Sequence, residues 1–152
     1  MTSLFLAFML AVLAPSGTTT VTPPLDVRKE VIPILDLCAK TEATQSESQN
    51  ERLFHYGKMV GTLFEERTKT SDEALVVLMN FYIGESLGDD LLHQITVRGK
   101  RMLPLLLKYR DVRVVFPERE YPSSVLLSAD VRTENFDNVI KSVKAGKIIG
   151  ED

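Results

Sequence analysis

The chain has 152 residues, a formal net charge of −3 and a single cysteine. This length suits one domain with an ordinary core, and so small a net charge gives no indication of an electrostatically driven partner. The one cysteine, Cys38, excludes an intramolecular disulfide and a metal site built from several thiolates, and we expect it to be a buried apolar side chain.

The first sixteen residues carry no charge and contain an apolar run from Leu4 to Ala14. This run is about half of the roughly 20 residues needed to cross a bilayer, and it matches the apolar core of a secretory signal peptide. No Lys or Arg precedes it, which departs from the usual signal pattern. Because Ala14 and Ser16 are a small pair around Pro15, we expect cleavage after Ser16 or after Gly17. The alternatives are an N-terminal helix packed into the core and an uncleaved membrane anchor.

These features predict a signal peptide at residues 1–16, a linker at 17–24 and one helical domain at 25–152. The linker, GTTTVTPP, is rich in Thr and Pro, and we expect it to be mobile. The domain begins with apolar residues at helical spacing over residues 25–40, where Pro33 must kink the helix or start a new one. The polar segment that follows, up to Asn50, predicts an exposed loop.

The next helix begins at a capping box, Ser48 with Glu51, and runs to about Arg67. Gly57 and Gly61 fall on its apolar face, which predicts close packing against a neighbouring helix. We expect this neighbour to be the helix predicted over residues 74–83.

A second capping box, Thr70 with Glu73, precedes residues 74–83, which are apolar nearly all round. We expect a helix in the middle of the domain, ended by Gly84 in the left-handed conformation. Asp89 is then predicted to cap a short helix.

Gly99 is expected to close that short helix, and Pro104 lies in the first turn of another, so the two are predicted to form a tight hairpin. The alternating residues 111–116 predict a short edge strand. Helices are predicted over 124–131 and 134–145, and the second has four core candidates, Phe136, Val139, Ile140 and Val143.

The predicted fold class is therefore all-α, an irregular bundle of short helical hairpins with a HEAT-like look. It is not a regular repeat array, because the tripeptide Asp-Val-Arg at 26, 111 and 130 has no fixed period. A likeness at the level of fold carries no functional content.

Residues Gly84 to Gly88 match G-x-S-x-G, the turn that presents a serine nucleophile in α/β-hydrolases. The segment before this turn is predicted to be a helix, not the strand that such a turn follows. The only histidine after Ser86 is His93, which is too near in sequence to act as its general base in the usual geometry. We therefore favour an ordinary turn between helices, and we predict no catalytic residue.

Glu85, Asp89, Asp90 and His93 lie close together in sequence, and side chains of these types can bind a divalent metal. Acidic residues at a helix start are favoured by the helix dipole without any metal, and we predict no metal and no cofactor. His55, the other histidine, is predicted to be a surface residue.

One segment, residues 98–113, has an excess of positive charge. It is the candidate binding surface, for an acidic protein partner or an anionic lipid surface, although the usual interpretation is a solvated helix face. Nucleic acid is disfavoured, because Tyr109 is the only aromatic residue in the segment. The candidate binding residues are Arg98, Lys100, Arg101, Lys108, Arg110 and Arg113.

From these features we expect an exported helical module, periplasmic or extracellular, that binds another protein and catalyses no reaction. We expect a monomer or a weak dimer. One alternative is a hydrolase or metal-dependent enzyme around the turn from Gly84 to Gly88. The other is a peripheral protein at a membrane surface, which is disfavoured.

Export predicts that mass spectrometry of the protein recovered from cells will find an N-terminus at Gly17 or Thr18, because signal peptidase removes the leader. Recovery of intact Met1 from a soluble cytosolic fraction would contradict this hypothesis.

Overall fold

A computed structural model describes residues 19–43, 57 and 70–151 of the chain. The predicted signal peptide, His55 and nearly all of the predicted helix before Arg67 lie outside the described residues. Gly57 is described and is exposed, and a Cβ atom added there would meet nothing within 4 Å. Within the described residues, nothing therefore packs closely against Gly57, and the rest of this predicted helix face lies outside them.

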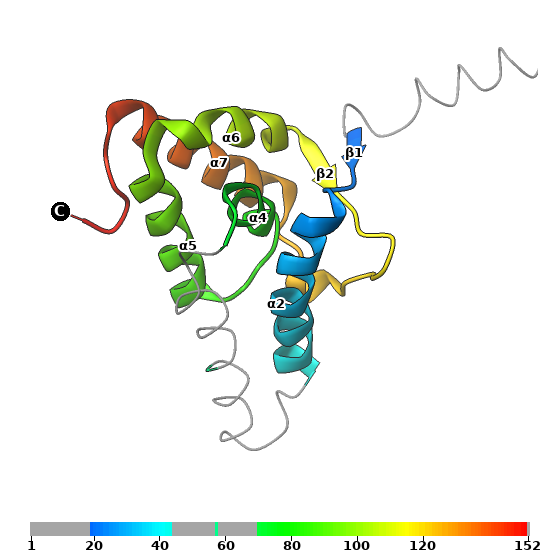
Figure 1. The fold of residues 1–152 in the computed structure, drawn as a ribbon. Helices are drawn as coiled ribbons and strands as arrows, with labels where there is room; N and C mark the ends of the chain where they lie inside the picture. Colours follow the sequence, from blue (N-terminus) through cyan, green and yellow to red (C-terminus); the bar gives the residue numbers. More distant parts are fainter. Residues whose placement is uncertain (1–18, 44–56, 58–69, 152) are drawn as a thin grey trace, which may run out of the picture.

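The described fold is mostly helical, as predicted. In Figure 1, the short helix α4 lies in the centre, surrounded by α2, α5, α6 and α7, and two short strands lie side by side at one edge. The elements in chain order are β1 (Thr19–Val21), α2 (Leu25–Ala43), α4 (Asp72–Leu78), α5 (Glu85–Arg98), a 3-10 turn (Gly99–Met102), α6 (Leu103–Arg110), β2 (Val112–Val114), a 3-10 turn (Ser123–Val125) and α7 (Ala129–Ala145).

The core is built around α4, whose residues from Ala74 to Leu78 are all 0 % exposed. This burial confirms the predicted central position, which follows from a helix that is apolar on every side. The surrounding helices each contribute fully buried side chains to the same core, among them Leu35 from α2, Ile95 from α5, Leu106 from α6 and Phe136 from α7.

The start of α4 is capped by Ser71, not by Thr70 as predicted. The Ser71 hydroxyl accepts a hydrogen bond from the Ala74 N–H at 3.2 Å. The same hydroxyl donates to Glu30 of α2 at 2.5 Å, and the Ser71 N–H donates to Glu30 at 2.9 Å. Glu30 therefore determines which residue caps α4, since its carboxylate bonds both the hydroxyl and the backbone N–H of Ser71.

The end of α4 also differs from the prediction, because the helix stops at Leu78 rather than near residue 83. The side chain of Asn80 donates to the Val77 carbonyl at 3.0 Å, which occupies an acceptor in the last turn. Phe81 then forms an isolated antiparallel bridge with Leu126. The segment after α4 is therefore extended, although its residues are apolar.

Gly84 has φ of +96° and ψ of 155° and precedes α5 as its N-cap. It does not end the preceding helix, and α5 begins at Glu85 instead of at Asp89. Gly99 ends α5 with φ of +79°, as predicted, and Pro104 lies in the first turn of α6. The connection is tight, and α6 leaves it across the top of the view in Figure 1.

The predicted edge strand is present as β2, paired in parallel with β1, with Thr19 opposite Val112 and Val21 opposite Val114. The strand β1 comes from the segment predicted to be a mobile linker. Part of that segment is therefore folded onto the domain, and Pro23 after it is buried. A strand of only three residues has too few positions to show an alternating pattern.

The helix predicted over residues 124–131 is not formed. A 3-10 turn ends at Val125, and α7 starts at Ala129 because the Ser128 hydroxyl accepts from the Val131 N–H at 3.4 Å. The helix predicted over residues 134–145 lies within α7, and its four predicted core residues are buried.

The helix α2 runs unbroken from Leu25 to Ala43 with Pro33 inside it, so Pro33 does not start a new helix. Cys38, on the same helix, is 5 % exposed. The prediction that Cys38 is buried is confirmed.

Replacing Ser71 with Ala should lower the free energy of unfolding by about 1 to 2 kcal/mol, because α4 loses its cap and Glu30 loses a hydroxyl partner. Chemical denaturation of the two proteins measures the difference. The control is Ser123→Ala, since Ser123 is exposed and caps no helix. Equal losses in both variants would contradict this role of Ser71.

Candidate functional site

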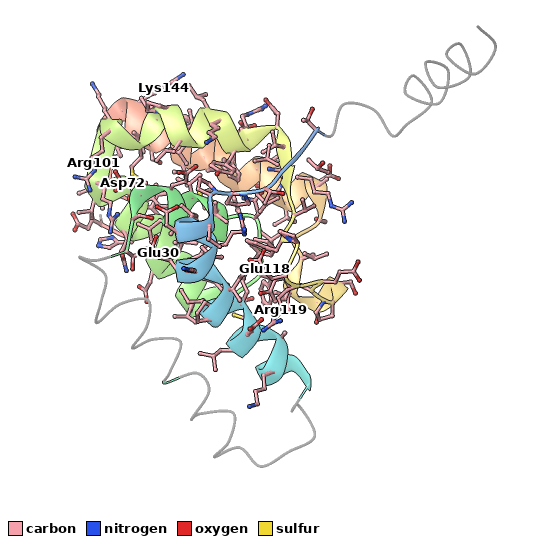
Figure 2. All side chains as sticks on the ribbon, turned by 45° about the vertical axis from the view of Figure 1, so that its right-hand side comes forward. Glu30, Asp72, Arg101, Glu118, Arg119 and Lys144 are labelled. Atoms are coloured by element: carbon pink, nitrogen blue, oxygen red, sulfur yellow. The ribbon has the colours of Figure 1, made fainter. Side chains whose placement is uncertain are left out.

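Four of the six basic residues of the segment 98–113 form ion pairs inside the fold. Arg98 donates hydrogen bonds to Asp72 Oδ1 at 2.7 Å and to the Thr70 carbonyl at 2.8 Å. Arg101 reaches the same Asp72 oxygen at 3.0 Å, and Figure 2 shows these two labelled residues together at the start of α4. These contacts join the end of α5 and the turn after it to α4.

The basic residues of α6 are paired in the same way. Lys108 Nζ donates to Glu73 Oε1 at 3.0 Å, and Arg110 Nε donates to Asp137 Oδ1 at 2.7 Å. The Tyr109 hydroxyl also donates to Glu73, at 2.7 Å. Burial, together with the Glu73 carboxylate, raises the pKa of Tyr109 well above its usual value. The helix α6 is therefore tied to both α4 and α7.

Lys100 and Arg113 complete the predicted binding set. Both are exposed, and neither forms an ion pair within the described residues. They lie on different elements, the 3-10 turn after α5 and the strand β2. The structure therefore does not bring the six residues together as one unpaired cationic surface, and contacts within the fold account for the charge of four of them.

The turn from Gly84 to Gly88 forms the start of α5. Ser86 and His93 lie on this one helix, about 10 Å apart along its axis at 1.5 Å per residue. His93 Nδ1 is 2.8 Å from the carbonyl oxygen of Ile149, so this nitrogen donates to the C-terminal segment. The arrangement differs from the strand, turn and helix of a nucleophile elbow.

Glu85 and Asp89 are exposed on α5. Within the described residues, no group of three or more His, Cys, Asp or Glu side chains is arranged to hold a metal ion.

No described helix is both long and apolar enough to cross a membrane.

A groove that the sequence analysis missed lies where the segment after α4 meets the segment leading into α7. It consists of three adjoining concavities, and Phe81 lines all of them. The first, beside α5, has a volume of about 290 Å³, the second, beside Arg132, about 320 Å³, and the third, beside Tyr121, about 270 Å³. We call this surface the Phe81 groove. Among the residues that line it are Phe81, Tyr82, Arg113, Val114, Glu120, Leu126, Leu127, Val131 and Arg132.

Three of the six large apolar side chains that are exposed among the described residues line this groove. Tyr82 is 41 % exposed, Leu126 39 % and Val131 45 %. Contiguous apolar surface that stays open to water is a common property of protein interaction sites. Other large apolar side chains are exposed outside the groove, among them Val97 on α5.

The floor of the groove is fixed by contacts between residues far apart in sequence. The Tyr82 N–H donates to the Val125 carbonyl at 2.7 Å beside the bridge of Phe81 with Leu126. The Phe81 ring stacks on Phe116, with ring centroids 5.6 Å apart. No local pattern marks such a surface, because it depends on pairings that only the folded chain makes.

A second set of contacts holds the wall of the third concavity against α2. The Tyr121 hydroxyl donates to Asp36 at 3.0 Å, and Arg119 pairs with the same carboxylate at 3.3 Å. Arg28 pairs with Glu118 at 3.0 Å (Figure 2). The segment between β2 and the second 3-10 turn therefore has a defined position.

Comparison of the chain with protein-family models, with curated proteins and with solved structures finds no match. The functional interpretation therefore rests on the geometry of the Phe81 groove and of the paired basic segment.

The contact of Asp72 with Arg98 predicts a pH dependence of stability. Burial raises the pKa of the Asp72 carboxyl, but hydrogen bonds from Arg98 and Arg101 outweigh it, so this pKa lies below its usual value of 3.8. A pKa that is lower in the folded state stabilises the fold above about pH 3.8, and this contribution is lost as the pH falls through the folded value.

Asp72→Asn should therefore lower the free energy of unfolding by about 1 to 3 kcal/mol at pH 7, and by less at a pH well below 3.8, where the contribution of the Asp72 charge is lost. Denaturant unfolding at both pH values measures the change. The matched control, Asp89→Asn, removes an exposed carboxylate and should cause little change at either pH. A loss of the same size at both pH values would contradict the role of the Asp72 charge.

Proposed function

We propose that the protein is an exported helical module that binds another protein through the Phe81 groove. The observation that carries the proposal is the position of Tyr82, Leu126 and Val131, which are exposed and line adjoining concavities. Burial of such side chains by a partner is favourable, since apolar area is removed from water.

The shape of the groove favours a protein partner over a small ligand. Small-molecule sites bury most of the ligand in one pocket of about 300 to 1,000 Å³. The three concavities are at the lower limit of this range and lie next to each other along a surface. Successive side chains of a polypeptide fit such a row better than one compact molecule does.

The paired basic residues are less suited to binding. A partner that bound Arg98 would compete with Asp72 for the guanidinium group. A partner that bound Lys108 would compete with Glu73 for the ammonium group. For the same reason the segment gives little support to a lipid surface, where unpaired Lys and Arg side chains provide the attraction. Arg113 differs, since it lines the groove itself.

Export is part of the proposal and is supported by the uncharged leader with its short apolar run. The proposal includes no catalytic step, and Ser86 and His93 have no assigned chemical role in it. We propose a monomer or a weak dimer in the absence of the partner.

The test is site-specific photocrosslinking in cells that make the protein. A benzophenone amino acid at position 82 or 126 should give a covalent adduct with one partner protein in the exported fraction, identified by mass spectrometry. The same probe at Val97, which is exposed on α5 outside the groove, is the matched control and should give none. Adducts of equal yield at all three positions, or none at 82 and 126, would overturn the proposed function.

A further inference from the structure

One edge of β2 is unpaired. The Val115 N–H donates to the Val21 carbonyl at 3.0 Å, so the backbone groups of this residue point toward β1. Because successive residues of a strand direct their N–H and C=O groups to opposite sides, those of Val114 point away from β1. In the described part of the chain, no backbone or side-chain partner bonds the N–H or C=O of Val114 at that edge.

The Phe81 groove runs along this open edge. Consecutive residues from Arg113 to Phe116 line the third concavity, and Phe81 and Leu126 line it as well. Arg113 and Val114 also line the second concavity. The strand β1 lines neither, because it occupies the other edge of β2. An unpaired strand edge is a template for an additional strand, and here it lies beside an apolar surface.

The charge along the edge is positive. Arg113 has no ion pair within the described residues. Arg132 donates to Asn80 Oδ1 at 3.3 Å and to the Tyr109 carbonyl at 3.2 Å, which are neutral acceptors. Burial lowers the pKa of Arg132, an effect that the Asp111 carboxylate opposes and the Arg110 charge reinforces, and Arg132 forms no ion pair within the described residues.

The remaining charges at this edge do not cancel the two arginines. Arg119 is paired with Asp36, and the one acidic residue among those that line the second and third concavities is Glu120, which lines the third. The edge therefore complements an acidic segment.

We propose that β2 accepts an extended acidic segment of the partner as a third strand, with an apolar side chain over Phe81 and a carboxylate at Arg113 and Arg132. This inference rests on the proposed function and specifies how the partner is bound. Backbone hydrogen bonds to Val114 provide affinity, and the alternation of side chains along the segment provides specificity. Such a segment supplies an ion-pair partner for Arg132, whose hydrogen bonds within the described residues go only to neutral acceptors.

The experiment uses the full chain and a defined probe, a blocked peptide of about six residues, the usual strand length, that alternates glutamate and valine. Fluorescence anisotropy measures its affinity. We expect saturable binding, and about tenfold weaker binding when alternate peptide amides are N-methylated, since the methyl groups block strand pairing and leave the charge unchanged. A peptide that alternates lysine and valine should not bind.

Variants of the protein provide a second test of the proposed binding site. Arg113→Glu should weaken binding of the acidic peptide about tenfold or more, because Arg113 is exposed on the edge strand and its charge is reversed. Lys100→Glu, which makes the same charge change on an exposed residue away from the groove, is the matched control and should bind like wild type. Circular dichroism confirms that both variants are folded.

Four results would overturn the inference. Equal binding of the N-methylated peptide would mean that only charge attracts it. Equal loss in Arg113→Glu and Lys100→Glu would mean that the binding site is not at β2. Sedimentation of the wild-type protein as a dimer that the acidic peptide does not dissociate would assign the edge to a second copy of the chain. If the crosslinks at positions 82 and 126 form but the acidic peptide does not bind, strand addition is wrong and the proposed function stands.

Discussion

Three consecutive residues at the start of α4 each bond a different helix. Ser71 bonds Glu30 of α2, Asp72 bonds Arg98 at the end of α5, and Glu73 accepts hydrogen bonds from Lys108 and Tyr109 of α6. The acidic side chains also lie at the positive end of the helix dipole, where negative charge is favoured. A seven-residue helix is too short to be stable alone, so these contacts and the surrounding apolar side chains fix α4 in the centre of the fold.

The same contacts explain why a segment rich in Lys and Arg has little free charge. Arg98 and Lys108 neutralise the acids of α4, and Arg110 neutralises Asp137 of α7. The surface on which the proposed function depends lies at the other end of α4, because the chain that leaves this helix enters the Phe81 groove directly. Anchoring the start of α4 therefore also determines where Phe81 lies, and with it the bridge to Leu126.

Much of the fold could be predicted from local patterns. The core face of α7 repeats at helical spacing, and Gly99 ends α5 because its φ of +79° suits a residue without a side chain. The errors occur where tertiary contacts outweigh local preference. Glu30 selects Ser71 as the cap over its neighbour Thr70, and pairing with Leu126 makes Phe81 extended. The candidate site could not be predicted for the same reason, because the residues that line the groove come from segments far apart in the sequence.

Amide hydrogen exchange of the full chain tests the central claim, that α4 is the anchored centre of the fold and fixes the floor of the Phe81 groove. The amides of Val77, Leu78 and Tyr82 should exchange only through global unfolding, with equal protection, because α4 is buried and the Tyr82 N–H is bonded to Val125. Fast exchange at Tyr82 beside slow exchange in α4 would show that the groove opens independently of the core. Fast exchange throughout α4 would contradict its central role.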